Sequence, residues 1–217
     1  MLRQIAGAVA LLGLALSASV ANQALADGKH SRFAEGTHYQ VLSEPVNVAD
    51  PDKIEVREFF FYGCPACFNV EPIVNDWKAN ASDDVDFVRS PVLFIRGAEP
   101  LARAYFVAEA KGILDEIHQP IFDAIHKHRE PLFSVPALAN FFRKYGVEPD
   151  EFNDLYSSFG VSTKVRQADT ASRDYRLTGV PSFTVNGKYV VLRSNLRNDQ
   201  ETFEVIDYLV NLEREAD

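Results

Sequence analysis

The spacing of apolar residues changes several times along this chain, and each change marks the border of a predicted element. Residues 53–62, KIEVREFFFY, combine β-branched and aromatic side chains and stop at Gly63, which predicts a buried strand. From Cys64 to Trp77 the apolar residues recur at the spacing of a helix. Residues 85–89 predict a second strand. The order strand, helix, strand is typical of an α/β fold.

The middle of the chain has a helical pattern that local breaks divide into several helices. Between residues 100 and 160, Gly112 ends one predicted helix and Ser134 is placed to cap another. Residues 150–158 predict a further short helix, and residues 162–177 a longer one. We therefore expect a block of helices in the middle of the chain.

Strand patterns return towards the C-terminal end. Residues 182–185 and 188–192 predict a β-hairpin joined by the two-residue turn Asn186–Gly187. An amphipathic helix follows over residues 203–210, and residues 39–42 predict a short edge strand near the start. The predicted fold class is therefore α/β, with one domain interrupted by an all-helical insertion.

The first residues predict a secretory signal peptide. Arg3 is the only charge before Asp27, the run 5–20 is apolar, and Ala24-Leu25-Ala26 has the small residues of a cleavage site. A membrane anchor is the alternative, but this run is shorter than the roughly 20 apolar residues of a spanning helix. We expect cleavage after Ala26 and export to a bacterial periplasm.

The charge of the chain restricts its partners. Its formal net charge is −9 at pH 7, so it repels phosphate backbones, and we expect no nucleic-acid partner. No stretch after residue 26 is apolar for long enough to cross a membrane.

The chain has two cysteines, and both lie in GCPACF, residues 63–68. Cys64 is placed at the predicted start of a helix, where free N–H groups and the helix dipole favour a thiolate. Pro65 suits the first helical position, because its missing N–H would have no partner there. We expect Cys64 to be the exposed, attacked sulfur and Cys67 the buried, resolving thiol.

Other uses of the cysteine pair fit less well. A disulfide between Cys64 and Cys67 closes a loop too short to stabilise much of the chain. A zinc site needs four ligands, and no histidine is close to the pair in sequence. The histidines at 126 and 128, with His118 upstream, are interpreted as a solvated helix end rather than as a surface metal site. We therefore expect no metal.

Two further positions are candidates for chemistry. Alternation along the first strand places Glu58 on an inward face, where burial would raise its pKa. It could accept the proton of Cys67 or form an ion pair with a lysine or arginine, and the pattern favours neither. Pro181 precedes the hairpin, and taken by itself this position is better explained by ordinary strand entry.

Three motifs together resemble the DsbA family of periplasmic thiol:disulfide oxidoreductases: EFFFYGCPACFNVEP (58–72), GVPSFTVNGKY (179–189) and FAEGTHYQVL (33–42). The resemblance implies a thioredoxin fold with a helical insertion. It also implies a cis Val180–Pro181 bond that holds a substrate strand beside the first cysteine, and it matches Glu58 to a buried acid beneath the site.

The resemblance also divides the chain into segments. It implies a signal peptide at 1–26, a first thioredoxin part at 27–96 with the cysteine pair, a helical domain at 97–168, and a second thioredoxin part at 169–217 with the proline loop, hairpin and last helix.

The expected function is a disulfide oxidase that donates the Cys64–Cys67 disulfide to reduced, unfolded secreted proteins through a mixed disulfide at Cys64. A quinone-linked membrane protein of the DsbB type would restore the disulfide, with no other cofactor, and we expect a monomer. The residues expected to contact substrate are Pro65, Ala66, Phe68, Val180 and Pro181.

One position departs from the family pattern. The strongest oxidants have histidine where this chain has Ala66, so a less oxidising disulfide is expected. A reductase or isomerase on the same fold is the nearest alternative. A periplasmic peptide-binding or chaperone protein with an incidental cysteine pair is the more distant one.

Overall fold

The computed structural model describes residues 32–216, and residues 35–216 belong to one compact unit. The predicted signal peptide and its cleavage after Ala26 lie outside the described residues.

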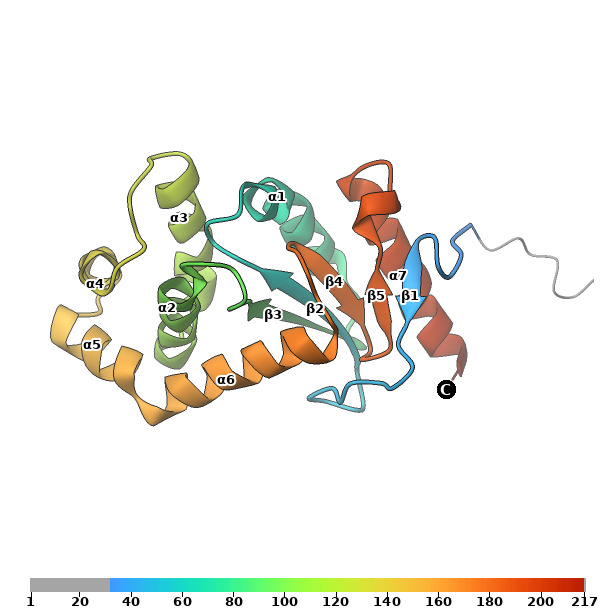
Figure 1. Ribbon diagram of the computed structural model, residues 1–217, viewed down its shortest axis with the longest axis horizontal. Coiled ribbons are helices and arrows are strands. Elements are labelled where there is room, and N and C mark those ends of the chain that lie inside the picture. The colour runs from blue at the N-terminus through green and yellow to red at the C-terminus, as the bar shows by residue number, and fades with distance from the viewer. Residues whose placement is uncertain (1–31, 217) are drawn as a thin grey trace, which may run out of the picture. The chain divides into compact units, whose positions relative to one another are not determined.

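A five-stranded mixed sheet lies at the centre of this unit, with strand order β1-β5-β4-β2-β3 (Figure 1). Only β2 and β3 pair in parallel; the other neighbours are antiparallel, and β1 is an edge strand as expected. The strands are β1 (Tyr39–Val41), β2 (Ile54–Phe60), β3 (Val85–Pro91), β4 (Ser182–Val185) and β5 (Tyr189–Val191).

Helices follow the predicted pattern closely. They are α1 (Pro65–Asn80), α2 (Ala98–Lys111), α3 (Leu114–His126), α4 (Val135–Arg143), α5 (Pro149–Ser157), α6 (Phe159–Asp174) and α7 (Asp199–Ala216), with a short 3₁₀ turn at Arg193–Asn195. The order of strands and helices confirms an α/β thioredoxin-type sheet interrupted by a run of helices, α2 to α6. The domain borders stay a prediction, and the border expected after residue 168 falls inside α6.

Two details of the predicted loops are wrong. The hairpin loop has three residues, 186–188, because Val185 pairs with Tyr189. Asn186 and Gly187 have φ angles of 49° and 69° there, and a Cβ on Gly187 would lie 1.9 Å from the carbonyl oxygen of Val46. Ser134 does precede α4, but its side chain makes no capping hydrogen bond.

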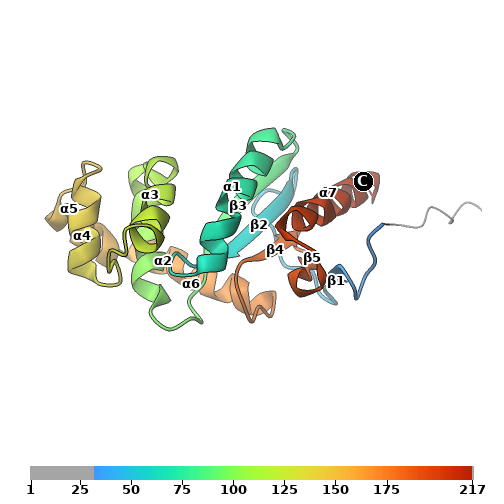
Figure 2. The same ribbon diagram turned by 90° about the horizontal axis from the view of Figure 1, so that it is seen from above.

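The two faces of β2 contact different helices. Phe59 packs against Tyr175, just after α6, with ring centroids 5.3 Å apart. Residues of the opposite face lie towards α1 and α3, because successive side chains of a strand point to opposite sides. The helices α1 and α7 lie side by side (Figure 2), and Trp77 Nε1 donates to Asp207 Oδ1 at 2.7 Å.

The helical run shares its core with the end of β2. Phe60 and Tyr62 are fully buried in one cluster with Ile117, Ile121 and Phe122 of α3. This shared core holds the segment after β2, which leads into Cys64, against the helices.

Candidate active site

Cys64 is the N-cap residue of α1. Its backbone is extended, with φ −88° and ψ 116°, and the N–H of Cys67 points to its Sγ at 3.3 Å. Both cysteines are free thiols in the structure; Cys64 is half-buried and Cys67 is buried. The predicted assignment of Cys64 as the accessible sulfur fits this geometry.

The two thiols have opposite electrostatic environments. The Cys67 side chain and the N–H groups of Cys67 and Ala66 hydrogen-bond to the Cys64 sulfur and lower its pKa to about 6, against the effect of burial. Burial, followed by the hydrogen bond to Cys64, raises the pKa of the Cys67 thiol. Near neutral pH the Cys64 thiolate and the protonated Cys67 therefore coexist, which is the arrangement that thiol–disulfide exchange requires.

The loop before β4 lies against Cys64. The Val180–Pro181 bond is cis, as the resemblance implied, and the Cys64 thiol donates to the Val180 carbonyl at 3.6 Å. Arg193 donates to the Pro181 carbonyl at 2.9 Å and Ser182 Oγ to that of Gly179 at 2.8 Å. These bonds fix the loop beside the sulfur.

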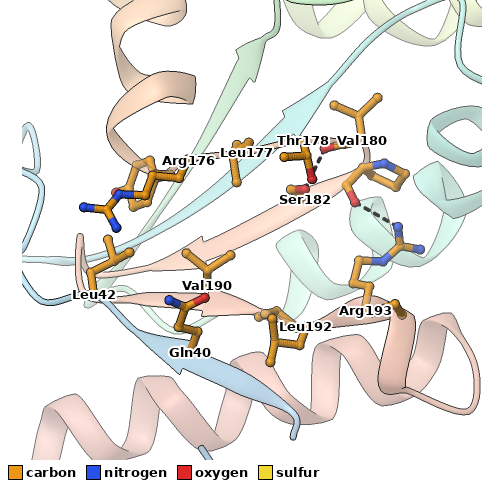
Figure 3. Close-up of a pocket in the computed structure, with 15 residues that line it drawn as sticks. Gln40, Leu42, Arg176, Leu177, Thr178, Val180, Ser182, Val190, Leu192 and Arg193 are labelled. Atoms are coloured by element: carbon orange, nitrogen blue, oxygen red, sulfur yellow. Dashed lines mark hydrogen bonds between the residues drawn. The ribbon is translucent and has the colours of Figure 1, made fainter. Parts of the chain in front are cut away.

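The same loop lines a pocket of about 420 Å³, together with residues of β1 and β5 (Figure 3). Gln40 and Leu42 border it on one side and Val180 and Arg193 on the other. The cysteines are not among the residues that line this pocket.

The other expected substrate contacts surround the cysteine pair. Pro65 and Ala66 are exposed and Phe68 is half-buried. A Cβ on Gly63 would lie 2.6 Å from the Phe61 ring and 3.1 Å from that of Phe133, so glycine allows these rings to approach the loop closely.

Glu58 is fully buried, as predicted. Its Oε2 accepts a hydrogen bond from Arg89 Nε at 3.1 Å, while its Oε1 has no partner among the described residues. Burial and the neighbouring Glu71 raise the pKa of Glu58 to about 8, although Arg89 opposes the shift. The ion pair is therefore present, and a second carboxylate oxygen remains available for a proton.

Glu58 belongs to a longer buried chain of polar groups that sequence reasoning missed. Arg89 Nη2 donates to Glu71 Oε2 at 3.0 Å, His118 Nε2 lies 3.2 Å from Glu71 Oε1, and His118 Nδ1 lies 2.8 Å from the Tyr62 hydroxyl. Burial lowers the pKa of His118, although Glu71 opposes the shift. For Glu71, burial raises the pKa, and the bonds from His118 and Arg89 outweigh it.

One feature of the sequence could have predicted part of this buried chain of polar groups. Glu71 follows Cys67 by four residues, so both lie on the same face of α1. Both are fully buried, and a buried acid next to a buried thiol requires a partner.

The interpretation of residues 126–128 as a solvated helix end is wrong for His126. Lys127 and His128 are exposed, whereas His126 is half-buried against the cysteine loop. His126 Nε2 donates to the Tyr62 carbonyl at 2.8 Å, and the imidazole stacks on Phe68 with a centroid distance of 4.9 Å. A local sequence pattern could not predict this contact, because 64 residues separate Tyr62 from His126.

Within residues 32–216, no group of three or more His, Cys, Asp or Glu side chains is placed to hold a metal ion. None of the helices described is long and apolar enough to cross a membrane.

Comparisons with known proteins agree with the site. The chain matches the family of DSBA-like thioredoxin domains over residues 55–203. It is 36% identical to the thiol:disulfide interchange protein DsbA of Pseudomonas aeruginosa over 85% of this chain and 87% of that protein. It is 38% identical to the DsbA of Azotobacter vinelandii, over 83% and 85% of the two chains.

The crystal structure of Pseudomonas aeruginosa DsbA superposes on it with a TM-score of 0.80 and 36% identity, covering 85% of this chain and 96% of that one. These relatives are thiol:disulfide interchange proteins, and the Cys64–Cys67 pair has the spacing that such an oxidoreductase uses. The chain belongs to the DsbA-like thioredoxin family.

Proposed function

We propose that this protein is a disulfide oxidase that donates a Cys64–Cys67 disulfide to reduced secreted proteins. The hydrogen bonds to the Cys64 sulfur carry this proposal. They stabilise the thiolate, which exists only in the reduced enzyme, so they favour reduction of the enzyme and oxidation of its substrate.

The reaction takes place in two exchanges. A substrate thiolate attacks Cys64 Sγ, which forms a mixed disulfide and breaks the bond between Cys64 and Cys67. Cys67 leaves as a thiolate and takes a proton, for which the buried Glu58 is the candidate carrier. A second substrate thiolate then attacks the substrate sulfur, and Cys64 leaves as a thiolate. The substrate loses two electrons, and the enzyme gains them.

The loop at Val180 and Pro181 is proposed to hold the substrate beside Cys64, with Pro65, Ala66 and Phe68 completing the contact surface. The pairing of the Cys64 thiol with the Val180 carbonyl supports this role, because it places loop and sulfur in contact. Glu58 and Pro181 complete the proposed catalytic set with the two cysteines.

The proposed setting follows from the family and the first residues. The protein would be exported to the periplasm after cleavage at Ala26 and act as a monomer. A quinone-linked membrane partner of the DsbB type would reoxidise it. We propose no cofactor besides the disulfide itself.

The test measures the direction of exchange in the mature chain. Equilibration with glutathione should give a reduction potential near about −120 to −150 mV, and the oxidised protein should oxidise a reduced two-cysteine peptide. Cys64→Ser should abolish the reaction, and Cys67→Ser should accumulate a mixed disulfide. A potential of about −250 mV or below would instead assign the protein as a reductase.

A further inference from the structure

His126 connects the helical run to the cysteine loop from the last turn of α3. Its Nε2–H donates to the carbonyl of Tyr62, two residues before Cys64, at 2.8 Å. Its ring stacks on Phe68, the residue after Cys67, with an interplanar angle of 14°. One side chain therefore contacts both flanks of the segment that carries the cysteines.

The position of His126 also gives it an electrostatic effect on the site. A positive charge on its ring lowers the pKa of the Cys64 thiol. The C-terminal end of α3 favours a cation at this point, because the last carbonyls of a helix carry partial negative charge. Ala66, between the cysteines, has no side chain that could supply such a charge.

The other titratable groups nearby are paired, exposed or protonated. Lys127 lies over the Phe68 ring, with its Nζ 5.7 Å from the centroid, and it pairs with Asp123 at 2.9 Å. His128 is exposed. On the cysteine loop, Cys67 is buried and its thiol stays protonated near neutral pH.

We propose that His126 is a positioning residue for Cys64. Its N–H and its ring hold the two flanks of the cysteine loop, and its positive charge, when protonated, stabilises the Cys64 thiolate. The imidazole that the cysteine loop itself lacks thus comes from α3. The inference rests on thiol–disulfide exchange at Cys64 but does not depend on the direction of that exchange.

The test compares three single variants of the mature chain. His126→Phe keeps an aromatic ring for Phe68 but has no N–H and no charge. His126→Gln keeps an amide N–H but has no ring and no charge. His128→Gln serves as the matched control, because it removes an exposed histidine two residues after His126.

The first readout is the equilibrium constant of each variant with glutathione. Both His126 variants should become less oxidising by about threefold to tenfold, where tenfold corresponds to about 30 mV. Ultraviolet titration of the thiolate should show Cys64 ionising at higher pH in both variants. His128→Gln should match the parent chain in both measurements.

A second readout separates this role from a purely structural one. We expect urea unfolding to show a larger loss of stability in the reduced form than in the oxidised form, because only the reduced form contains the thiolate. Equal losses in both forms, or a thiolate titration unchanged in both His126 variants, would overturn the proposal. Failure of the parent chain to oxidise a peptide would refute the proposed function and leave this test intact.

Discussion

At the scale of single residues, the site depends on the contrast between Cys64 and Cys67. One turn of helix separates them, yet the pKa of Cys64 is lowered to about 6 while that of Cys67 is raised. The Cys67 side chain and the free N–H groups at the helix start act on the first sulfur, and burial acts on the second. The contrast defines which sulfur a substrate attacks.

This contrast predicts a pH dependence of stability in the reduced protein. The pKa of Cys64 is lower in the folded state than the ordinary value of 9.0, so its stabilising effect is complete above about pH 9 and is lost as the pH falls to about 6. We therefore compare the urea midpoints of the reduced parent chain and of reduced Cys64→Ser. The parent chain should gain stability over the variant as the pH rises from about 6 to about 9. A difference between the two midpoints that does not change with pH would contradict the lowered pKa of Cys64.

Glu58 gives a second prediction at this scale. Glu58→Gln removes the carboxylate whose free Oε1 lies in the buried site, so proton transfer at Cys67 should slow by roughly tenfold to a hundredfold. The inflection of the exchange rate near pH 8, set by the raised pKa of Glu58, should disappear. Single-turnover exchange with a peptide across this pH range measures both effects.

Glu55→Gln is the matched control for that experiment. Glu55 is buried in the same strand but pairs with Arg57 at 2.7 Å, away from the cysteines. Unchanged rates and an unchanged pH profile in Glu58→Gln would leave the ion pair with Arg89 as the only role of Glu58.

At the scale of elements, a buried polar chain joins β2, β3, α1 and α3. Arg89 on β3 contacts Glu58 on β2 and Glu71 on α1, and Glu71 contacts His118 on α3. Each of these groups would be costly to bury alone, and together they satisfy one another except at Glu58 Oε1. The register of β3 beside β2 places Arg89 directly opposite Glu58.

Arg89→Met should therefore destabilise the protein by about 3 to 5 kcal/mol, because it leaves buried carboxylates without their cation. Chemical denaturation at neutral pH measures this free energy. Arg173→Met is the control: Arg173 pairs with Asp169 on the surface of α6, so its loss should cost below about 1 kcal/mol. Similar costs for the two variants would show that the buried chain contributes little stability.

At the scale of the whole described unit, the sheet and the helical run share one core beneath the cysteines. Phe122 of α3 lies 4.9 Å from the Tyr62 ring and 6.2 Å from the Phe68 ring, measured between centroids. The helices thus form one wall of the site and also contribute His118 and His126. Substitutions in the helical core should therefore change the reactivity of the Cys64 sulfur.

Phe122→Ala tests this coupling. It should cost about 3 to 5 kcal/mol of stability, because Phe122 is fully buried, and it should also change the alkylation rate of Cys64. Phe152→Ala is the matched control, since Phe152 is equally buried but packs against Phe142, 4.7 Å away between centroids. It should lose similar stability and leave the alkylation rate unchanged. Equal alkylation rates in both variants would contradict the coupling.

The local pattern was sufficient for the elements around the cysteines. Residues 53–62 predicted β2, and the change to helical spacing at Cys64 predicted the start of α1, because both signals lie within a few consecutive residues. Loop details were less predictable: the three-residue hairpin loop depends on which residues of β4 and β5 pair. Ser134 precedes a helix as expected, but its hydroxyl does not cap it.

The sequence by itself determined the class of fold, the reactive pair at a helix start and the burial of Glu58, since periodicity and helix-end chemistry are local. Only the tertiary structure decided which groups surround that pair. Arg89 reaches Glu58 across 31 residues and His126 reaches Tyr62 across 64. Such contacts depend on strand register and helix packing, so no local pattern distinguishes the buried His118 and the half-buried His126 from the exposed His128.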